Sequence, residues 1–437
     1  MTKAPLSSDA ARRVFLTLSF TRWFPVGLVV GILLLFQLDR GLSITQALTA
    51  SAVSGLVVFL LELPTSSFAD GFGRRPVYVL AACVNVAASG IYLVAHSFWM
   101  FATAACLMGV FRALDSGPLE AWFVDTVHLS EPGLDVDGPL AKQGAVLGGG
   151  VAAGALLSGA LVWWHPVPSQ SALTLPVLIF AGLNVLHLCA VLTLMREPAP
   201  VTANKSFQRA MESARQAPIV MRAGARLLRK NRVLLGLVLV EVFWAIAMVV
   251  FEQFQPIRLA ELLGSAERAG AWMGPVAAAG WAVFALGSTI AGVSARRIGI
   301  TRTAILARAF NSLGAIAMGL VAGPALLVAA YLSTYALHGG AGPVHAALLH
   351  REASASNRAT VLSMNSMMSF AAFSAAAPLL GLLAAGTSNQ TAMVTAGTVS
   401  LLGILCYLPA LRHERTTSDP MRDACRPPTS SEALGSN

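Results

Sequence analysis

The chain contains twelve runs of about 20 mainly apolar residues, and no other feature limits its possible folds so strongly. Each run is bounded by charged or turn residues, and they span 14–36, 44–63, 77–95, 98–122, 143–164, 174–195, 234–255, 271–295, 303–322, 325–348, 359–384 and 391–411. A helix needs about 20 apolar residues to cross the hydrocarbon core of a bilayer. Because the backbone cannot stay unpaired in hydrocarbon and these runs are too long for barrel strands, each is predicted to be a transmembrane helix.

The composition agrees with lipid covering much of the protein. Of the 437 residues, 56% are hydrophobic and 12% are charged, whereas soluble domains carry about 25% charged residues. The first run is too long for the core of a cleaved signal peptide and lacks a cleavage site, so it is predicted to stay as an uncleaved span. The five cysteines show no CxxC spacing, which argues against a disulfide framework or a zinc site.

The chain is not predicted to be an enzyme, and no cofactor or metal is expected. It contains neither the G-x-x-x-x-G-K-[ST] loop of nucleotide hydrolases nor an H-E-x-x-H zinc motif. No soluble segment is large enough to hold a nucleotide. An ion gradient is therefore the expected source of energy.

The basic residues predict the orientation. The chain has 30 Lys plus Arg, and with both termini in the cytoplasm the outer loops contain only Arg40, Arg258 and Arg268. Setting aside the intramembrane Arg22 and Arg112 leaves 25 on the inner side. Inner loops of membrane proteins are enriched in Lys and Arg. We therefore expect a multi-pass protein of the plasma (inner) membrane with both termini cytoplasmic, and the net charge of +9 needs no nucleic acid partner.

A polar stretch divides the twelve runs into six and six. We predict an N-terminal six-helix bundle (1–195), a cytoplasmic basic linker (196–233), a C-terminal six-helix bundle (234–412) and a disordered cytoplasmic tail (413–437). Residues 197–232 contain eight Lys or Arg and two Glu. Such a composition is typical of a helix on anionic headgroups, while a regulatory or protein-binding role stays open.

Two landmarks indicate an internal repeat. The loop after the second run ends in Gly73-Arg-Arg, and the loop after the eighth run reads Arg-Arg-Ile-Gly299, an offset of 226 when the glycines are aligned. Ser-Gly-Pro at 116–118 matches Ala-Gly-Pro at 341–343, an offset of 225. Because six is even, the two repeats keep the same orientation, as in parallel repeats related by an axis along the membrane normal.

The segment 63–75, Leu-Pro-Thr-Ser-Ser-Phe-Ala-Asp-Gly-Phe-Gly-Arg-Arg, resembles the signature loop of the major facilitator superfamily, G-x-L-A-D-R-x-G-R-[RK]. It keeps the motif's Asp, second Gly and basic pair, and has Ser66 and Gly71 in place of its first Gly and first Arg. The resemblance implies an all-α membrane protein of the major facilitator fold, with twelve transmembrane helices in two parallel six-helix bundles. It also implies a monomer that moves small molecules by alternating access.

By the same resemblance, Asp70, Gly73, Arg74 and Arg75 would form a cytoplasmic gate. The gate would latch the inner side while the outer side is open, since contacts at helix ends can be made in one state and broken in the other. The alternative is that these residues only cap a helix and supply the positive-inside charge.

Charges within the apolar runs are destabilising unless paired, so they mark candidate functional residues. We select Arg22, Arg112, Asp115, Glu120 and Glu241 for proton coupling or substrate binding. By length along their runs, Arg22, Arg112, Asp115 and Glu241 share the inner half of the membrane, and pairing across a cavity is geometrically feasible. Arg112 and Asp115 are three residues apart on one helix face; a static salt bridge is the alternative to proton coupling.

The stretch 112–117 resembles the span-4 motif R-x-x-x-G of proton-coupled antiporters with its Gly displaced by one, and the Gly-rich stretch 144–154 resembles their span-5 motif in degenerate form. Trp23 and Trp244, at similar places in the first and seventh runs, are candidate cavity aromatics. The resemblance favours drug/proton antiporters, which implies proton-coupled efflux of a moderately apolar drug, antibiotic or secondary metabolite, and hence antibiotic resistance. The alternatives are a proton symporter importing a small polar or anionic nutrient, and, in a different class, a non-transporting membrane receptor or a membrane-embedded enzyme.

Overall fold

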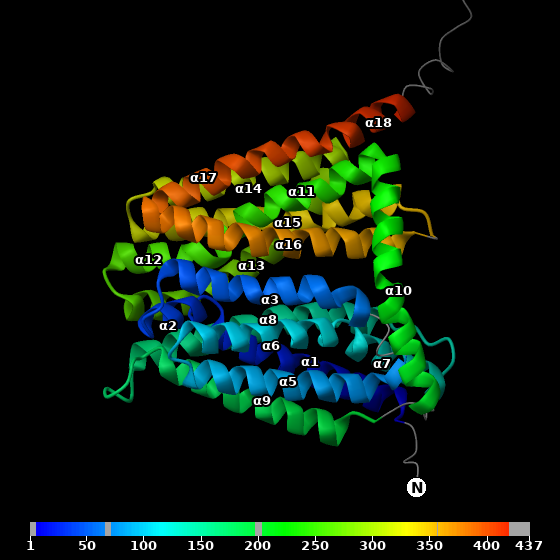
Figure 1. Cartoon of the computed structure of the whole chain (residues 1–437), viewed down its shortest axis with the longest axis horizontal. Helices are drawn as coiled ribbons and strands as arrows, with labels where there is room; N and C mark the ends of the chain where they lie inside the picture. Colours follow the sequence, from blue (N-terminus) through cyan, green and yellow to red (C-terminus); the bar gives the residue numbers. More distant parts are fainter. Residues whose placement is uncertain (1–5, 66–70, 197–202, 356, 419–437) are drawn as a thin grey trace, which may run out of the picture.

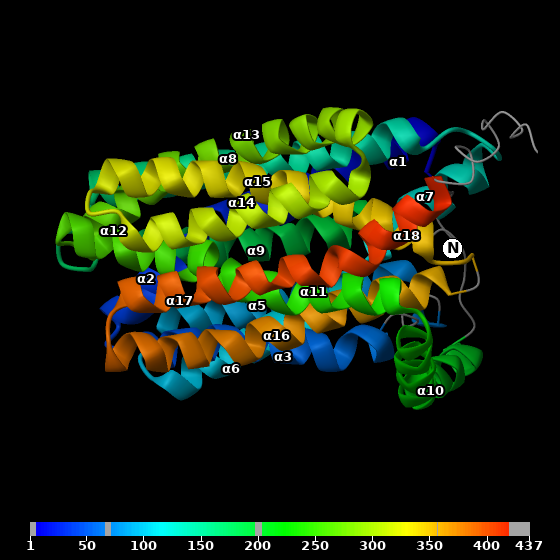
Figure 2. The same ribbon diagram turned by 90° about the horizontal axis from the view of Figure 1, so that it is seen from above.

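The computed structural model describes residues 6–65, 71–196, 203–355 and 357–418. Every regular element within these residues is helical. Long helices run side by side as a bundle (Figure 1), and the same bundle seen from above forms several layers (Figure 2). The prediction of an all-helical chain is therefore confirmed for the described residues.

The described part of the N-terminal half, within residues 6–196, provides eight of the helices discussed below. They are α1 (Ser8–Val29), α2 (Leu33–Asp39), α3 (Ile44–Thr65), α5 (Arg74–Val94), α6 (Phe98–Asp115), α7 (Pro118–Ser130), α8 (Asp137–Trp164) and α9 (Thr174–Leu194). A separate helix, α10 (Ala203–Lys230), follows.

The C-terminal half, residues 232–418, continues directly from α10. Its elements are α11 (Arg232–Val249), the π-helical turn η1 (Val250–Phe254), α12 (Gln255–Leu263), α13 (Ala266–Ile298), α14 (Ile300–Leu320), α15 (Pro324–Glu352), α16 (Arg358–Gly386), α17 (Asn389–Leu401), the 3-10 turn η2 (Leu402–Tyr407) and α18 (Leu408–Ser418).

Ten helices in the described residues are long and apolar enough to cross a membrane, and α1 with α2, bent by 42° at their junction, makes an eleventh. The 29-residue α15 is not among these helices, and it carries His338, His345, His350 and Arg351. It nevertheless packs against α13 and α14 inside the bundle. The protein is thus a multi-pass membrane protein, while the count of twelve spans stays a prediction.

Several predicted boundaries change. Gly117, with φ +94°, ends α6 and Pro118 starts α7, because a left-handed residue followed by proline cannot continue a helix. The fourth run is therefore two helical segments that extend to Ser130. The predicted tail begins inside a helix, since α18 reaches Ser418, and residues 419–437 lie outside the described residues.

The repeat predicted from Gly73 and Gly299 recurs in the backbone. Gly73 has φ +98° and ψ 153°, and Gly299 has φ +91° and ψ 154°. Each residue immediately precedes a helix of 21 residues, α5 and α14. Only glycine adopts this conformation without strain, so both halves use the same device to turn the chain. The other landmark diverges, because Gly342 and Pro343 lie within the continuous α15.

The two ends of the bundle differ. At one end, which we call the linker end, α10 crosses the bundle in contact with α3, α11 and α16 (Figure 1). The start of α1 and the end of α18 lie at the same end (Figures 1 and 2). The opposite end, the far end, holds α2, α12 and the start of α17 (Figures 1 and 2).

The halves share their apolar core at the far end. One large cluster of buried residues combines Phe36, Phe101 and Leu173 of the N-terminal half with Phe254 and Met393 of the C-terminal half. Toward the linker end, the buried clusters of the described residues belong to one half each, with Leu228 of α10 joining that of the C-terminal half. Apolar packing therefore closes the bundle at the far end.

Two helix pairs carry the contact between the halves, α3 with α16 and α8 with α13. On α8, a Cβ built on Gly159 would lie 2.7 Å from the Ala271 carbonyl oxygen and 2.9 Å from Gly274 Cα, so backbone touches backbone there. The Gly-rich stretch singled out in the sequence serves a different contact, because Gly154 packs on the Phe24 carbonyl of α1 within the same half.

Candidate functional site

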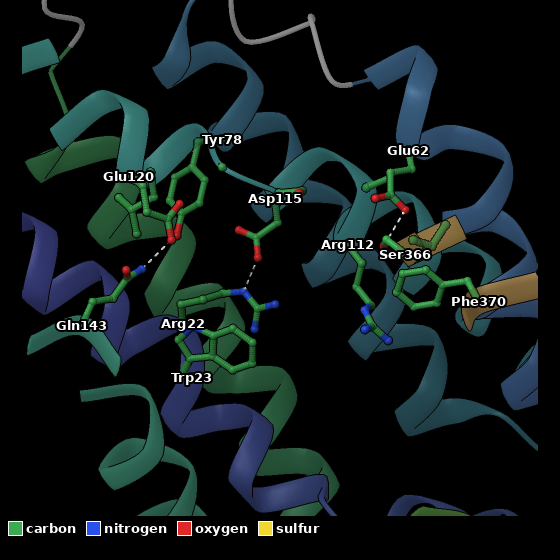
Figure 3. A pocket seen from close by; sticks show the side chains of 15 residues that line it. Arg22, Trp23, Glu62, Tyr78, Arg112, Asp115, Glu120, Gln143, Ser366 and Phe370 are labelled. Atoms are coloured by element: carbon green, nitrogen blue, oxygen red, sulfur yellow. Dashed lines mark hydrogen bonds and ion pairs between the residues drawn. The ribbon is translucent and has the colours of Figure 1, made fainter. Parts of the chain in front are cut away.

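A cavity of about 400 Å³ lies between the halves, toward the linker end. Thirteen of its fifteen lining residues come from the N-terminal half and two from α16; the charged and polar ones are Arg22, Glu62, Tyr78, Arg112, Asp115, Ser116, Glu120, Gln143 and Ser366 (Figure 3). Arg112, Ser116 and Gly117 are exposed although they lie inside the bundle. The cavity is therefore open to solvent.

Arg22 and Asp115 form an ion pair across the cavity wall. Arg22 Nε donates to Asp115 Oδ2 at 2.9 Å, which joins α1 to the last residue of α6. The Arg22 guanidinium also lies 4.6 Å from the ring centre of Trp23 and 4.3 Å from that of Phe111. The side chains are 7% and 16% exposed, so Asp115 keeps an opening to the cavity while Arg22 is buried. Of the charges expected to share the inner half of the membrane, Arg22 is thus the one that pairs with Asp115, and the helix neighbour Arg112 is not.

Arg112 points away from Asp115 toward the opposite wall (Figure 3). Its guanidinium lies 5.3 Å from the ring centre of Phe370 on α16, a cation–π contact between the halves. No carboxylate of the described residues lies within ion-pair distance of it. An exposed guanidinium in a cavity, held by a ring and by no carboxylate, is suited to bind an anion.

Two further carboxylates line the cavity and accept hydrogen bonds from neutral groups. Ser366 Oγ of α16 donates to Glu62 Oε2 at 3.0 Å, which joins the two halves. Gln143 Nε2 of α8 donates to Glu120 Oε1 at 2.6 Å (Figure 3). Glu120 thus lines the same cavity as Arg22, Arg112 and Asp115, and its part in proton coupling or substrate binding stays a prediction.

Glu241 lies elsewhere, in a buried network of the C-terminal half. Arg308 Nη2 of α14 donates to Glu241 Oε1 at 3.1 Å, and His345 Nε2 of α15 lies 3.3 Å from the same oxygen. His345 also contacts Tyr407 Oη at 3.0 Å and Asn365 Oδ1 at 3.1 Å. The side chains of Arg308 and Glu241 are 7% and 5% exposed. This group does not meet the cavity charges, so the expected pairing across the cavity does not include Glu241.

The two candidate cavity tryptophans have different surroundings. Trp23 lines the cavity (Figure 3). Trp244 is not among the residues lining it; its ring stacks on His338 with centres 5.1 Å apart, and the Arg308 guanidinium lies 4.5 Å from its centre.

The signature loop is described in part, because Asp70 lies outside the described residues. Gly73 is the N-cap of α5. Arg74 Nε pairs with Asp125 Oδ2 of α7 at 3.1 Å, and Arg75 donates to the Met195 carbonyl at 2.7 Å and the Leu192 carbonyl at 3.0 Å, just beyond and within the last turn of α9. These bonds tie three helices of one half together, and the gate stays a prediction.

Sequence reasoning missed Arg308, Glu62, Ser366 and Phe370. Arg308 carried a signal, since it is a charge inside the apolar run 303–322, and its burial lowers the inner-side basic count to 24. Glu62 lies at the end of the apolar run 44–63, where a carboxylate is expected to reach water. Ser366 and Phe370 are ordinary residues of a membrane helix, and only the packing of α16 on α3 brings them to the cavity. Within the described residues, no three His, Cys, Asp or Glu side chains gather as a metal site requires.

A helical bundle with a polar cavity between two halves is the architecture of a membrane transporter. The family model described as Major Facilitator Superfamily matches residues 15–348. The chain belongs to the Major Facilitator Superfamily, which points to a transporter of small molecules and not to an enzyme. No match was found among curated protein sequences.

Solved structures share the fold at low sequence identity. The nucleoside transporter NupG superposes with a TM-score of 0.73 at 13% identity, over 91% of this chain and 98% of that chain. A mutant of the peptide transporter POT in complex with sulfate gives 0.71 at 15% identity, over 92% and 94%. The human organic anion transporter MFSD10 (TETRAN) gives 0.59 at 16% identity, over 92% and 99%. At such identities the likeness concerns the fold alone.

Proposed function

We propose that this chain is a proton-coupled secondary transporter that carries a small polar or anionic molecule by alternating access, with Arg112 holding the anionic group. The observation that carries the proposal is the exposed Arg112 guanidinium, which faces the cavity with Phe370 as its neighbour and no carboxylate of the described residues in ion-pair distance. Arg provides a planar fork of donors that suits carboxylates and phosphates.

The cavity wall favours polar cargo over the moderately apolar compound that the sequence suggested. Five of its side chains are ionisable acids or bases of opposite sign, namely Arg22, Glu62, Arg112, Asp115 and Glu120. An apolar molecule would displace water from these groups without replacing its hydrogen bonds, and each such loss disfavours binding. Trp23 and Phe370 supply aromatic surface for the carbon skeleton of a polar ligand.

Asp115 is the proposed proton carrier. It reaches the cavity, whereas Glu241 is buried beside Arg308 and outside the cavity lining. A proton on Asp115 would remove the charge that holds Arg22, so the α1 to α6 ion pair would open and re-form as the proton binds and leaves. Such two-state contacts are the elements that switch a bundle between arrangements.

In the proposed topology the linker end lies on the cytoplasmic side of the plasma membrane, because the basic residues of the chain gather in the loops at that end. In this arrangement the structure corresponds to the inward-open state, with its apolar core closed on the outer side.

The test is a ligand screen on the purified full chain by thermal unfolding. A bound ligand at about 100 times its Kd stabilises a protein by about 2.7 kcal/mol, so binders raise the unfolding temperature. We expect small carboxylates, amino acids, short peptides or phosphorylated metabolites to do so in the wild type and not in Arg112→Gln. Arg268→Gln, an exposed arginine at the far-end start of α13, is the matched control and should keep the effect.

Stabilisation by lipophilic amines or uncharged dyes that survives Arg112→Gln would overturn the polar assignment in favour of drug export. The direction of transport is determined in membrane vesicles across which a pH gradient has been imposed. Loss of the gradient in everted vesicles on adding the identified ligand indicates exchange for protons and hence export. Alkalinisation of the medium around intact cells indicates co-transport and hence import.

A further inference from the structure

The outward face of α10 carries a stripe of cations. Ile219, Arg222, Arg226, Arg229 and Lys230 recur mainly at spacings of three and four, so they lie on one side of the helix. All five side chains are exposed, Ile219 at 65%. From Arg222 to Lys230 the stripe extends for about 12 Å at 1.5 Å per residue. We call these five residues the basic face.

The opposite side of α10 is fixed by packing. A Cβ on Gly224 would lie 3.0 Å from the Met364 side chain of α16, and Leu228 is 5% exposed within the buried cluster that includes Leu234 and Leu237. Because this side is held against the C-terminal half, the basic face must point away from the bundle. The helix cannot rotate to hide its charges without losing that packing.

The helix also has a definite place relative to the membrane. It crosses the linker end roughly at right angles to the spanning helices (Figure 1) and is seen almost end-on after the turn to Figure 2. It contacts α3 of one half and α11 and α16 of the other. A helix that lies across the ends of spanning helices runs parallel to the bilayer plane, on the linker side of the bundle.

The four cations have no acidic partner among the described residues, because none of the ion pairs there includes them. We propose that the basic face binds the headgroups of anionic phospholipids. The exposed Ile219 within the face favours a lipid surface over a nucleic acid, since an apolar side chain inserts among acyl chains and gains nothing from a phosphate backbone. The inference does not depend on the cargo or on Arg112.

The test titrates the detergent-purified full chain with phosphatidylglycerol or phosphatidylcholine and follows lipid binding by native mass spectrometry. Each Lys or Arg near an anionic surface contributes about 1 kcal/mol, or about fivefold. We therefore expect Arg222→Gln, Arg226→Gln, Arg229→Gln and Lys230→Gln combined to weaken phosphatidylglycerol binding by at least about tenfold and to leave phosphatidylcholine binding unchanged.

The matched control removes three exposed cations of the same end, Arg296→Gln, Arg297→Gln and Arg302→Gln on α13 and α14, and should keep the affinity within about twofold. An equal loss of phosphatidylglycerol affinity in both variants would mean that the lipid is attracted by the total positive charge of this end. That result would overturn the basic face as a binding site. Binding of polyglutamate in preference to phosphatidylglycerol would overturn the lipid assignment in favour of an acidic protein. If the fourfold variant fails to fold, the wild type is measured at 1 M salt, where the Debye length falls to about 3 Å. It should then lose its preference for phosphatidylglycerol, and a preference kept at that salt concentration refutes the proposal.

Discussion

A single methyl group at the contact between α8 and α13 should change which end of the protein is open. In Gly159→Ala the new Cβ would lie 2.7 Å from the Ala271 carbonyl oxygen and 2.9 Å from Gly274 Cα, where ordinary contact begins at 3.4 Å. The helices must therefore separate by about 0.5 to 0.7 Å, because both neighbours are backbone atoms that cannot rotate away. Overpacking of this kind costs about 1–3 kcal/mol.

That free energy destabilises only the state that makes the contact. Gly159 and Gly274 belong to different halves, so a state with the far end open relieves the overlap. A difference of 1–3 kcal/mol corresponds to a population shift of about 5- to 150-fold toward that state. Alanine also favours the helix itself by about 1 kcal/mol over glycine. Gly149→Ala on the same helix, where a Cβ meets nothing within 4 Å, is the control for that effect.

Electron–electron distance measurements check the prediction in a background without the five native cysteines. Spin labels on His128→Cys and Arg302→Cys report the linker end, and labels on Gln170→Cys and Leu326→Cys report the far end. Gly159→Ala should shorten the first distance and lengthen the second, and Gly149→Ala should change neither. Unchanged distances together with a lower unfolding temperature would show that the contact is static, and would refute the reasoning.

Three further predictions concern charge and backbone. Arg308→Gln leaves Glu241 buried without its cation, which should destabilise the protein by about 3–5 kcal/mol. Adding Glu241→Gln should recover most of the lost stability in thermal unfolding. A double variant as unstable as the sum of the two single variants would contradict this prediction. Asp115→Asn should stop ligand-dependent proton movement in vesicles while exchange of labelled for unlabelled ligand continues, and normal proton movement in this variant would rule Asp115 out as the carrier. Gly299→Ala should lower the free energy of unfolding by about 1–3 kcal/mol, because φ at this residue is +91°. A Cβ there meets nothing within 4 Å, so backbone strain and not a clash would be the cause. Gly73→Ala should behave alike, and an unchanged unfolding temperature in both variants would disprove backbone strain.

The arrangement of the candidate site was predictable only in part. Arg22, Arg112, Asp115 and Glu120 stand out in sequence because charges are rare in apolar runs, and all four line the cavity. Their partners were not predictable. Helix spacing made Arg112 the nearest candidate for Asp115 and left Arg22 open, and the direction of the side chains from α1 and α6 selects Arg22. The partners of Glu241 come from other helices far along the chain, which no local pattern encodes.

The length and apolar character of the runs by themselves determine that this chain is a helical membrane protein, because each span must satisfy its own backbone hydrogen bonds in lipid. The loop motif at residues 63–75 indicated the family in the same way, through local chemistry. The tertiary structure alone decided that Ser366 and Phe370 join the cavity and that the far end is the closed one. Those features depend on contacts between residues hundreds of positions apart, and such contacts follow from how whole helices pack, which local sequence constrains only weakly.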